Sequence, residues 1–156
     1  MARLAANSIL DAVNGIVVSA YPSDKSYVNY LPHDFVRPSF LYQQVRVSRA
    51  DATRWTQRIT VNLTITIFAA QDAHGHMDTM TLLSRQAGVM DALSHGAIYV
   101  DDRAVSINSI SGGQDLDAAT VDVAIEYFDD RPPVSPSGAQ LMRDIRITYV
   151  INNEVI

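Results

Sequence analysis

Four side chains that could bind a metal ion stand at alternate positions in the stretch QDAHGHMD: Asp72, His74, His76 and Asp78. Alternate side chains of an extended chain share one face, so these four could offer carboxylate oxygens and imidazole nitrogens to one cation. Such a pattern is loosely constrained, and we favour a polar loop in which Asp78 caps a following helix. We therefore predict no metal ligand and no cofactor. A small metal-dependent enzyme centred on His74 and His76 is the weaker alternative.

Other enzyme signatures are missing from the sequence. GGQDLD, residues 112–117, resembles a calcium loop only loosely, because the other acidic positions and the terminal Glu of an EF-hand are absent. No Gly-x-Ser-x-Gly stretch, Walker motif or dinucleotide fingerprint occurs. The chain has no cysteine, which excludes thiolate catalysis and cysteine-bound zinc and is compatible with a reducing cytoplasm. We predict that the chain is not an enzyme.

The composition is that of a folded protein. A chain of 156 residues, 47% hydrophobic and 19% charged, can bury a core without disulfides or metal. No stretch reads as a signal peptide or a membrane span, so no membrane partner is expected. The formal net charge of −5 argues against a protein that grips nucleic-acid phosphates, but it suits a passage through which DNA slides without sticking.

Two helices are predicted from apolar residues at three- and four-residue spacing. The first lies within residues 2–18, and Pro22 should end it near Ala20 because proline restricts the residue before it. The second is predicted over residues 78–95, and Gly96 can supply its left-handed exit.

The clearest pattern in the chain is the alternation of apolar and polar residues over 55–69, which predicts a long strand with one solvated face. A preceding strand is predicted over residues 40–49, and residues 50–54 offer a connecting loop. Together they predict a long antiparallel hairpin. One face of the preceding strand is expected to carry Leu41, Val45 and Val47.

Three shorter strands are predicted over residues 97–101, 104–110 and 118–128, with turns at Asp101-Asp102 and Ser111-Gly112-Gly113. Alternating strands with only two helices favour a sheet that is covered on one side. The predicted fold class is therefore α+β. We expect a mainly antiparallel sheet with two helices packed on one face, a long β-hairpin and an extended C-terminal tail.

The C-terminal part has the composition of a linker and a tail, beginning with RPPVSPSG at residues 131–138. We expect a single α+β domain over residues 1–131, followed by a Pro-rich linker and a strand-like tail over residues 132–156. Apolar residues alternate in the tail, so it could form a strand in this subunit's sheet or in a neighbour's. These residues are Ile145, Ile147, Tyr149 and Ile151.

The stretch YLPHDFVRPSFLYQQV, residues 30–45, is unusually apolar for a connector. Pro32 and Pro38 restrict its backbone, and Phe35 and Phe40 can anchor it on the core. We therefore interpret it as a mount that delivers the chain into the hairpin in a fixed direction. Its aromatic residues are predicted to serve the core or a subunit interface, because base stacking requires a positively charged groove.

The order of these parts carries a resemblance that covers residues 3–129. It rests on Tyr21-Pro22 after the first helix, on Pro32 and Asp34-Phe35 before Arg37-Pro38-Ser39-Phe40, on the strand pair that follows, and on Tyr127-Phe128 late in the chain. This combination resembles the phage tail terminator family, also called tail completion or tail-to-head joining proteins. The tail after Arg131 is longer than the family pattern.

The resemblance implies a non-catalytic subunit that assembles into a ring, typically a hexamer, on the last ring of a finished tail tube. Such a ring stops tube growth and forms the joint to the head. The implied partners are further copies of the chain, the tail tube protein, a head-tail connector or neck protein and, in a contractile tail, the sheath. Double-stranded DNA would pass through the lumen without specific binding.

The implied location is the virion tail, assembled in the cytoplasm of the bacterial host. A neck adaptor or a tube-like ring protein of the same particle is the main alternative, because such proteins share size, acidity and oligomerisation.

Closed rings use two different patches on each subunit, so we expect the hairpin of residues 40–69 to dock on the helix-and-sheet surface of the next subunit. The candidate subunit-interface residues are Phe35, Arg37, Val45, Val47, Trp55, Arg58 and Tyr149.

Overall fold

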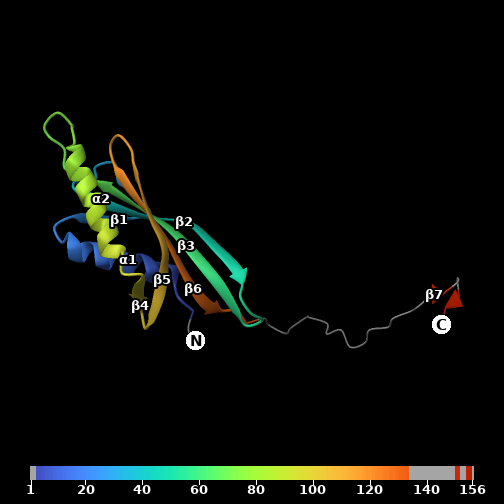
Figure 1. Ribbon diagram of the computed structural model, residues 1–156. Coiled ribbons are helices and arrows are strands. Elements are labelled where there is room, and N and C mark those ends of the chain that lie inside the picture. The colour runs from blue at the N-terminus through green and yellow to red at the C-terminus, as the bar shows by residue number, and fades with distance from the viewer. Residues whose placement is uncertain (1–2, 134–149, 152–153, 156) are drawn as a thin grey trace.

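The computed structural model describes residues 3–133, 150–151 and 154–155 (Figure 1). Its elements are α1 (Ala6–Ala20), β1 (Lys25–Val28), β2 (Ser39–Asp51), β3 (Thr56–Phe68), α2 (Thr79–Leu93), β4 (Ala97–Val100), β5 (Arg103–Gln114), β6 (Ala119–Asp130), β7 (Val150–Ile151) and β8 (Glu154–Val155). The first six strands form one sheet in the order β1-β2-β3-β6-β5-β4, antiparallel throughout except for β1 with β2. The predicted α+β fold with a mainly antiparallel sheet is confirmed.

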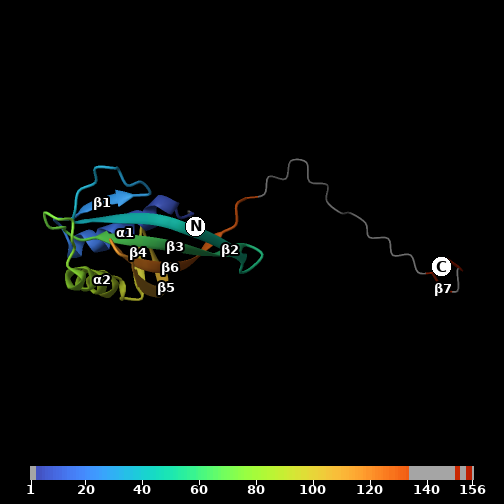
Figure 2. The ribbon, with the colours of Figure 1, turned by 90° about the horizontal axis from the view of Figure 1, so that it is seen from above.

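Both helices cover the same face of the curled sheet (Figures 1 and 2). Strand β3 lies at the centre, and its odd-numbered side chains point toward the helices because side chains alternate along a strand. These buried residues are Ile59, Val61, Leu63, Ile65 and Ile67. Buried residues of α1, α2, β2, β4, β5 and β6 complete one hydrophobic core. The predicted linker and tail lie almost entirely outside the described residues.

The helix boundaries follow from the residues that mark them. Helix α1 ends at Ala20, as the proline at position 22 predicts. Asp78 caps α2 by accepting hydrogen bonds from the Met80 backbone N–H (3.2 Å) and the Thr81 hydroxyl (2.8 Å). The hydrogen bond from Thr81, followed by the one from Met80, lowers the pKa of Asp78. Gly96 follows the helix with φ +79°, as predicted.

The turn predicted at Ser111-Gly112-Gly113 is wrong, because these residues lie inside β5 and pair with β6. The glycines serve helix–sheet packing instead. Gln86 of α2 donates from Nε2 to the carbonyl oxygens of Gly113 (2.7 Å) and Thr120 (2.9 Å). A Cβ on Gly112 would lie 2.8 Å from that nitrogen, so a larger residue there would displace the Gln86 side chain.

The prediction that Leu41, Val45 and Val47 share one face is also wrong. A β-bulge between Gln44 and Arg46 shifts the register of β2 against β3 by one residue. Before the bulge Leu41 pairs with Thr66 on the face away from the helices, whereas after it Val47 pairs with Val61 on the helix face. The bulge therefore directs Val47 to the opposite side of the sheet from Leu41.

A small second cluster packs on the face away from the helices and holds the connector before β2. Leu41, Phe68 and Ala118 form it, together with Tyr27, Leu31 and Phe35. The rings of Phe35 and Phe68 are 4.8 Å apart, and Tyr27 accepts a hydrogen bond from the Val36 N–H at 3.0 Å. Phe40 is buried in the main core. The connector is thus anchored on both faces of the sheet, which suits a segment that delivers the chain into the hairpin in a fixed direction.

The buried tyrosine of β2 predicts a loss of stability in alkali. Burial raises the pKa of Tyr42 to about 12, whereas an unfolded tyrosine titrates near 10. The folded state therefore holds this proton more tightly, and its contribution of about 2 to 3 kcal/mol is complete below pH 10 and is lost as the pH rises toward 12. Tyr42→Phe should flatten the fall of the unfolding free energy over this range, as measured by urea denaturation.

The slope should not vanish in that variant, because burial also raises the pKa of Tyr127. An unchanged slope in Tyr42→Phe would show that Tyr42 does not carry the effect.

Candidate assembly surface

The β2–β3 hairpin continues beyond β1 as an arm, defined here as residues 43–64. Strand β1 pairs only with Ser39–Tyr42, so β2 has no strand along its outer edge from residue 43 to 51 among the residues that the structure describes. Most of this stretch is exposed. Figure 1 shows the arm running past α1 to a turn at the end of the molecule opposite the 69–78 loop. An unpaired, exposed edge is a ready surface for another chain.

The helix-side face of the arm contains an open hollow of ≈ 510 Å³. Its residues are Leu4, Gln44, Val47, Arg49, Ile59, Val61 and Tyr127. The floor is apolar, because Ile59 and Val61 are each only 3% exposed, while Val47 at the rim is 40% exposed. Leu4 is fixed in one wall because its backbone N–H donates to Oδ2 of Asp129 at 3.1 Å. This arrangement can receive apolar side chains of a partner.

Buried Asp129 organises the wall of the hollow. Its Oδ1 accepts from Nη2 of Arg103 at 3.2 Å, while its Oδ2 accepts from the N–H of Leu4. The carboxylate is 3% exposed, and a buried charge is tolerated where it is paired and hydrogen-bonded. Asp129 therefore ties the Leu4 wall of the hollow to the end of β6.

The tip of the arm presents Trp55, which is 71% exposed. Trp55 lies in the turn before β3 rather than at the start of the strand, where its place in the alternation put it. The Thr53 hydroxyl accepts from the N–H groups of Trp55 (3.1 Å) and Thr56 (3.0 Å), which orders the turn. Arg54 lies 4.9 Å from the centre of the indole ring. The tip is an ordered, exposed aromatic projection.

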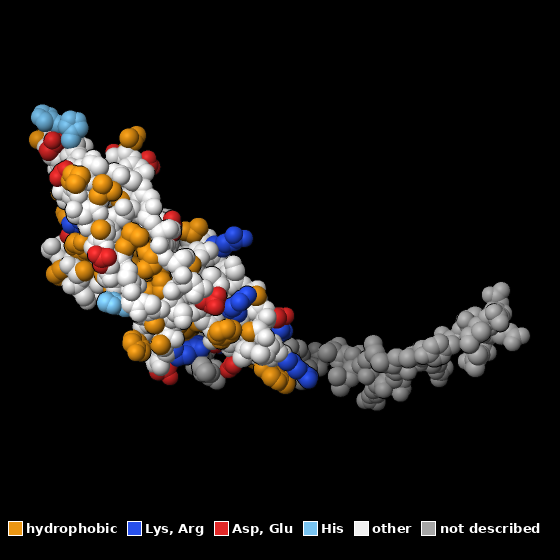
Figure 3. Space-filling model, in the orientation of Figure 1, with side chains coloured by type: hydrophobic (Ala, Val, Ile, Leu, Met, Phe, Trp, Pro, Cys, Tyr) orange, Lys and Arg blue, Asp and Glu red, His pale blue; other side chains and the backbone are white. Residues whose placement is uncertain are grey.

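The chain leaves the sheet at this same tip. The Arg131 N–H donates to the Trp55 carbonyl at 2.9 Å, and its guanidinium Nη2 lies 2.7 Å from Oδ1 of Asp51. Figure 3 shows apolar and charged side chains mixed at this end of the molecule. The start of the predicted linker is therefore attached at the tip, next to the end of β2.

The face of the arm away from the helices carries Arg58 and Phe128 as a cross-strand pair. Nε of Arg58 is 4.0 Å from a carboxylate oxygen of Glu126, and Phe128 is 56% exposed. Phe128 was missed as a candidate interface residue. In the alternation of β6, Phe128 falls on the face opposite to Val121, Val123 and Ile125. This position was the sequence signal that could have identified it.

Phe35 and Arg37 lie away from the arm, in the connector. The Arg37 guanidinium is 5.1 Å from the ring centres of both Phe35 and Phe68. Its Nη1 donates to Met77 Sδ at 3.1 Å and to the Ala69 carbonyl at 3.4 Å. Arg37 thus ties the connector to the end of β3 within one subunit. The structure brings Val45, Val47, Trp55 and Arg58 onto one arm, and Tyr149 lies outside the described residues.

Substitution of Arg37 separates these intrachain contacts from an interface role. Arg37→Met should lower the unfolding free energy by about 1 kcal/mol because it removes the cation above two rings, and Arg37→Glu should lower it further because a carboxylate is repelled by the ring faces. Urea denaturation measures both. If Arg37→Glu instead blocks assembly with no loss of stability, Arg37 belongs to the subunit interface, as the sequence predicts.

The histidine loop has local hydrogen bonding rather than a metal geometry. Oδ1 of Asp72 accepts from the backbone N–H groups of His74 (2.8 Å) and His76 (2.9 Å), and Asp78 is engaged as the cap of α2. In the described part of the chain, no group of three or more His, Asp or Glu residues could hold a metal ion. The pale blue histidine side chains at one end of Figure 3 lie far from the arm.

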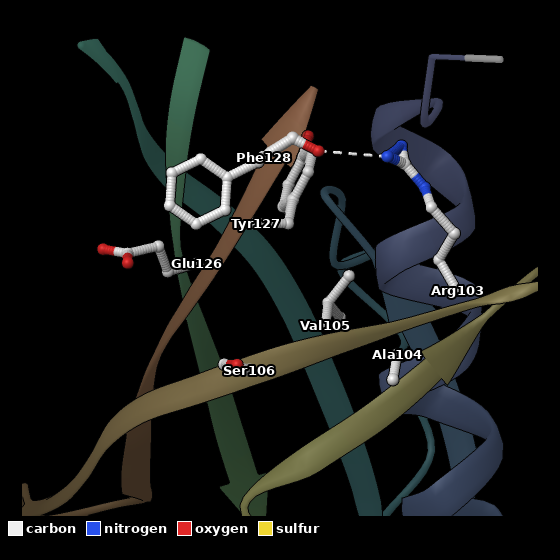
Figure 4. Close-up of a pocket in the computed structure, with 7 residues that line it drawn as sticks. All are labelled: Arg103, Ala104, Val105, Ser106, Glu126, Tyr127 and Phe128. Atoms are coloured by element: carbon white, nitrogen blue, oxygen red, sulfur yellow. Dashed lines mark hydrogen bonds between the residues drawn. The ribbon is translucent and has the colours of Figure 1, made fainter. Parts of the chain in front are cut away.

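A further gap of ≈ 260 Å³ opens where β5 and β6 diverge after the Ser106–Glu126 pair. Figure 4 shows Arg103 reaching across from β5 to the Phe128 carbonyl, to which its Nη1 donates at 3.0 Å. The same guanidinium contacts Asp129. Arg103 therefore has a structural role, because it joins β5 to the end of β6.

No protein-family model and no curated protein matches the chain. A solved protein chain whose designation names no activity is similar at 15% identity and a TM-score of 0.44, over 85% of this chain and 100% of the other. Similarity at this level carries no functional argument.

No helix in the described ranges is long and apolar enough to cross a membrane.

Proposed function

We propose that this chain is the structural ring subunit of a phage or phage-like tail terminator. In this role a ring of identical subunits, typically six, caps the head-proximal end of the tail tube, stops its polymerisation and joins it to the head or neck. The protein then acts in the virion tail after assembly in the bacterial cytoplasm. It performs no catalysis.

The arm is the observation that carries this proposal. It combines an unpaired strand edge, an apolar hollow and a projecting tryptophan at one end of a rigid sheet. Exposed apolar features of this kind, rimmed by Arg49 and Gln44, are typical of protein–protein contact surfaces. An arm at one end that docks on a different patch of the next subunit is the arrangement by which a closed ring forms.

The charge of the chain agrees with the same role. A ring through which DNA passes must not bind the phosphates, and the formal net charge of −5 provides repulsion rather than attraction.

Electron microscopy of the purified protein tests the proposal. A terminator is expected to give single rings that do not stack, whereas a tube-like protein would give stacks of growing length. The double variant His74→Ala/His76→Ala should form the same rings, because the histidine loop lies far from the arm (Figure 3). Loss of function in that variant with rings intact would favour the metal-dependent alternative.

A further inference from the structure

We propose that the free edge of β2 binds the C-terminal segment, residues 143–151, of a neighbouring copy of this chain as an added strand. The inference rests on that part of the proposed function which says that copies of the chain associate. It goes further by naming the segment that links them.

The backbone orientation of β2 makes the edge competent for pairing. Tyr42 directs its carbonyl away from β3, because it accepts from the Asn29 N–H at 2.8 Å. Tyr42 pairs with Ile65 of β3, and Val47 and Arg49 pair with Val61 and Ile59, which lie four and six residues from Ile65. Positions two apart in an antiparallel ladder have the same orientation. Val47 and Arg49 therefore present their backbone groups outward.

The comparable edge of β5 is partly occupied. Strand β5 also extends beyond its neighbour β4, but Gln86 of α2 donates to the Gly113 carbonyl there. Beyond Tyr42, no described residue hydrogen-bonds to the outward backbone groups of β2, apart from the local contacts within the turn at the tip. The bulge and the charged side chains of Arg46 and Arg49 disfavour pairing with unrelated strands. A partner strand must therefore be complementary to this edge.

The C-terminal segment has a matching length and pattern. The free edge spans residues 43–51, and the segment of residues 143–151 has the same length. Its alternating apolar residues are Ile145, Ile147, Tyr149 and Ile151. A strand added to β2 would place one side of this alternation on the same face as Val47, over the apolar hollow.

The point of departure of the tail favours a neighbour over the same subunit. Arg131 leaves the sheet at the arm tip, held to Trp55 and Asp51, and Pro132 and Pro133 follow at once. Prolines favour an extended chain over the reversal that pairing with the same subunit's β2 would need. The linker of residues 132–142 can extend about 34 Å at the polyproline rise.

Disulfide trapping tests this pairing directly, because the chain has no cysteine of its own. Full-length Val47→Cys and full-length Ile147→Cys are mixed under ring-forming conditions, oxidised and separated without reductant. The expected main product is a cross-linked heterodimer of the two variants. Full-length Ser111→Cys, which places an exposed cysteine on β5, replaces Val47→Cys as the matched control and should lose this product.

A second variant removes the pairing without removing the cysteine. Arg49→Pro deletes an outward N–H while leaving the ladder with β3 intact, so in the Val47→Cys background it should abolish the heterodimer. Circular dichroism confirms that this variant is folded.

Three outcomes overturn the inference. The first is a product no more abundant than in the Ser111→Cys control. The second is an intrachain cross-link in the double variant Val47→Cys/Ile147→Cys without the heterodimer in the mixture, which would place the tail on its own subunit. The third is a Val47→Cys homodimer as the main species, which would pair two β2 edges. Rings that form without the heterodimer would refute this inference and leave the proposed function intact. A heterodimer without rings would support the strand pairing and contradict the proposed ring.

Discussion

Val47→Asp is expected to abolish ring assembly while leaving the subunit folded. Val47 lines the hollow on the helix face of the arm and is 40% exposed in the isolated subunit, so a carboxylate there can reach water before assembly. In the ring the side chain would be covered. Loss of its apolar contact alone, about 1.5 kcal/mol, corresponds to roughly tenfold weaker association. Burial of an unpaired carboxylate adds a cost of several kcal/mol.

Sedimentation velocity measures this effect, and the adjacent residue provides the control. Ser48→Asp introduces the same charge one residue later, at an exposed position on the other face of the sheet, and should assemble normally. Val45→Asp tests the outer face of the sheet, the one away from the helices, where Val45 lies beside Asn62 and Thr64. If Val45→Asp blocks assembly and Val47→Asp does not, docking occurs on the outer face and the hollow is not the contact site.

Asp24→Ala is expected to give the largest loss of stability in the subunit, about 3 to 5 kcal/mol. Asp24 forms an ion pair with Arg85 of α2, and the two side chains are only 4% and 17% exposed. The Arg85 guanidinium lies 4.8 Å from the ring centre of Tyr21 and 5.4 Å from that of Phe40. Burial lowers the pKa of Arg85, which means that its surroundings disfavour the charge. Removing Asp24 leaves that charge unpaired.

Urea denaturation of three variants tests this prediction. Asp34→Ala removes an exposed carboxylate from the connector before β2 and should change the unfolding free energy by less than about 0.5 kcal/mol. Arg85→Met in the Asp24→Ala background should restore much of the lost stability, because an apolar side chain suits the two rings. Equal losses of unfolding free energy in Asp24→Ala and Asp34→Ala would show that the Asp24–Arg85 ion pair does not stabilise the fold.

The elements with strong local signals were predictable from the sequence. Pro22, Asp78 and Gly96 act within one turn of the helix ends that they determine, so no tertiary information is needed to read them. The alternation in β3 is equally local, and the odd-numbered apolar residues are buried as it predicts.

The errors arose where a distant segment decides the local structure. Gly112 and Gly113 are typical turn residues, but here they remain in β5 because they pair with Val121 and Thr120 of β6. Strand β1 has four residues and no alternation of burial, and it exists because it pairs in parallel with β2. The bulge near Val45 leaves no pattern in the sequence, so the faces of Val45 and Val47 could not be assigned.

The candidate site shows the same division. Val45, Val47 and Trp55 were predicted as interface residues, but the exposure of Val47 depends on how far the helices extend over the sheet. Periodicity does not encode that distance. Arg37 was chosen for its type and neighbours, whereas its actual contacts, Phe68, Ala69 and Met77, come from segments more than thirty residues away.

Native mass spectrometry of the full-length protein over a concentration series tests the central claim most directly. The account predicts one closed assembly, a hexamer of about 103 kDa from six chains of 17.2 kDa, which saturates without larger species. Assemblies that keep growing with concentration would contradict a terminator. A chain that is monomeric at every concentration would contradict the self-assembling ring.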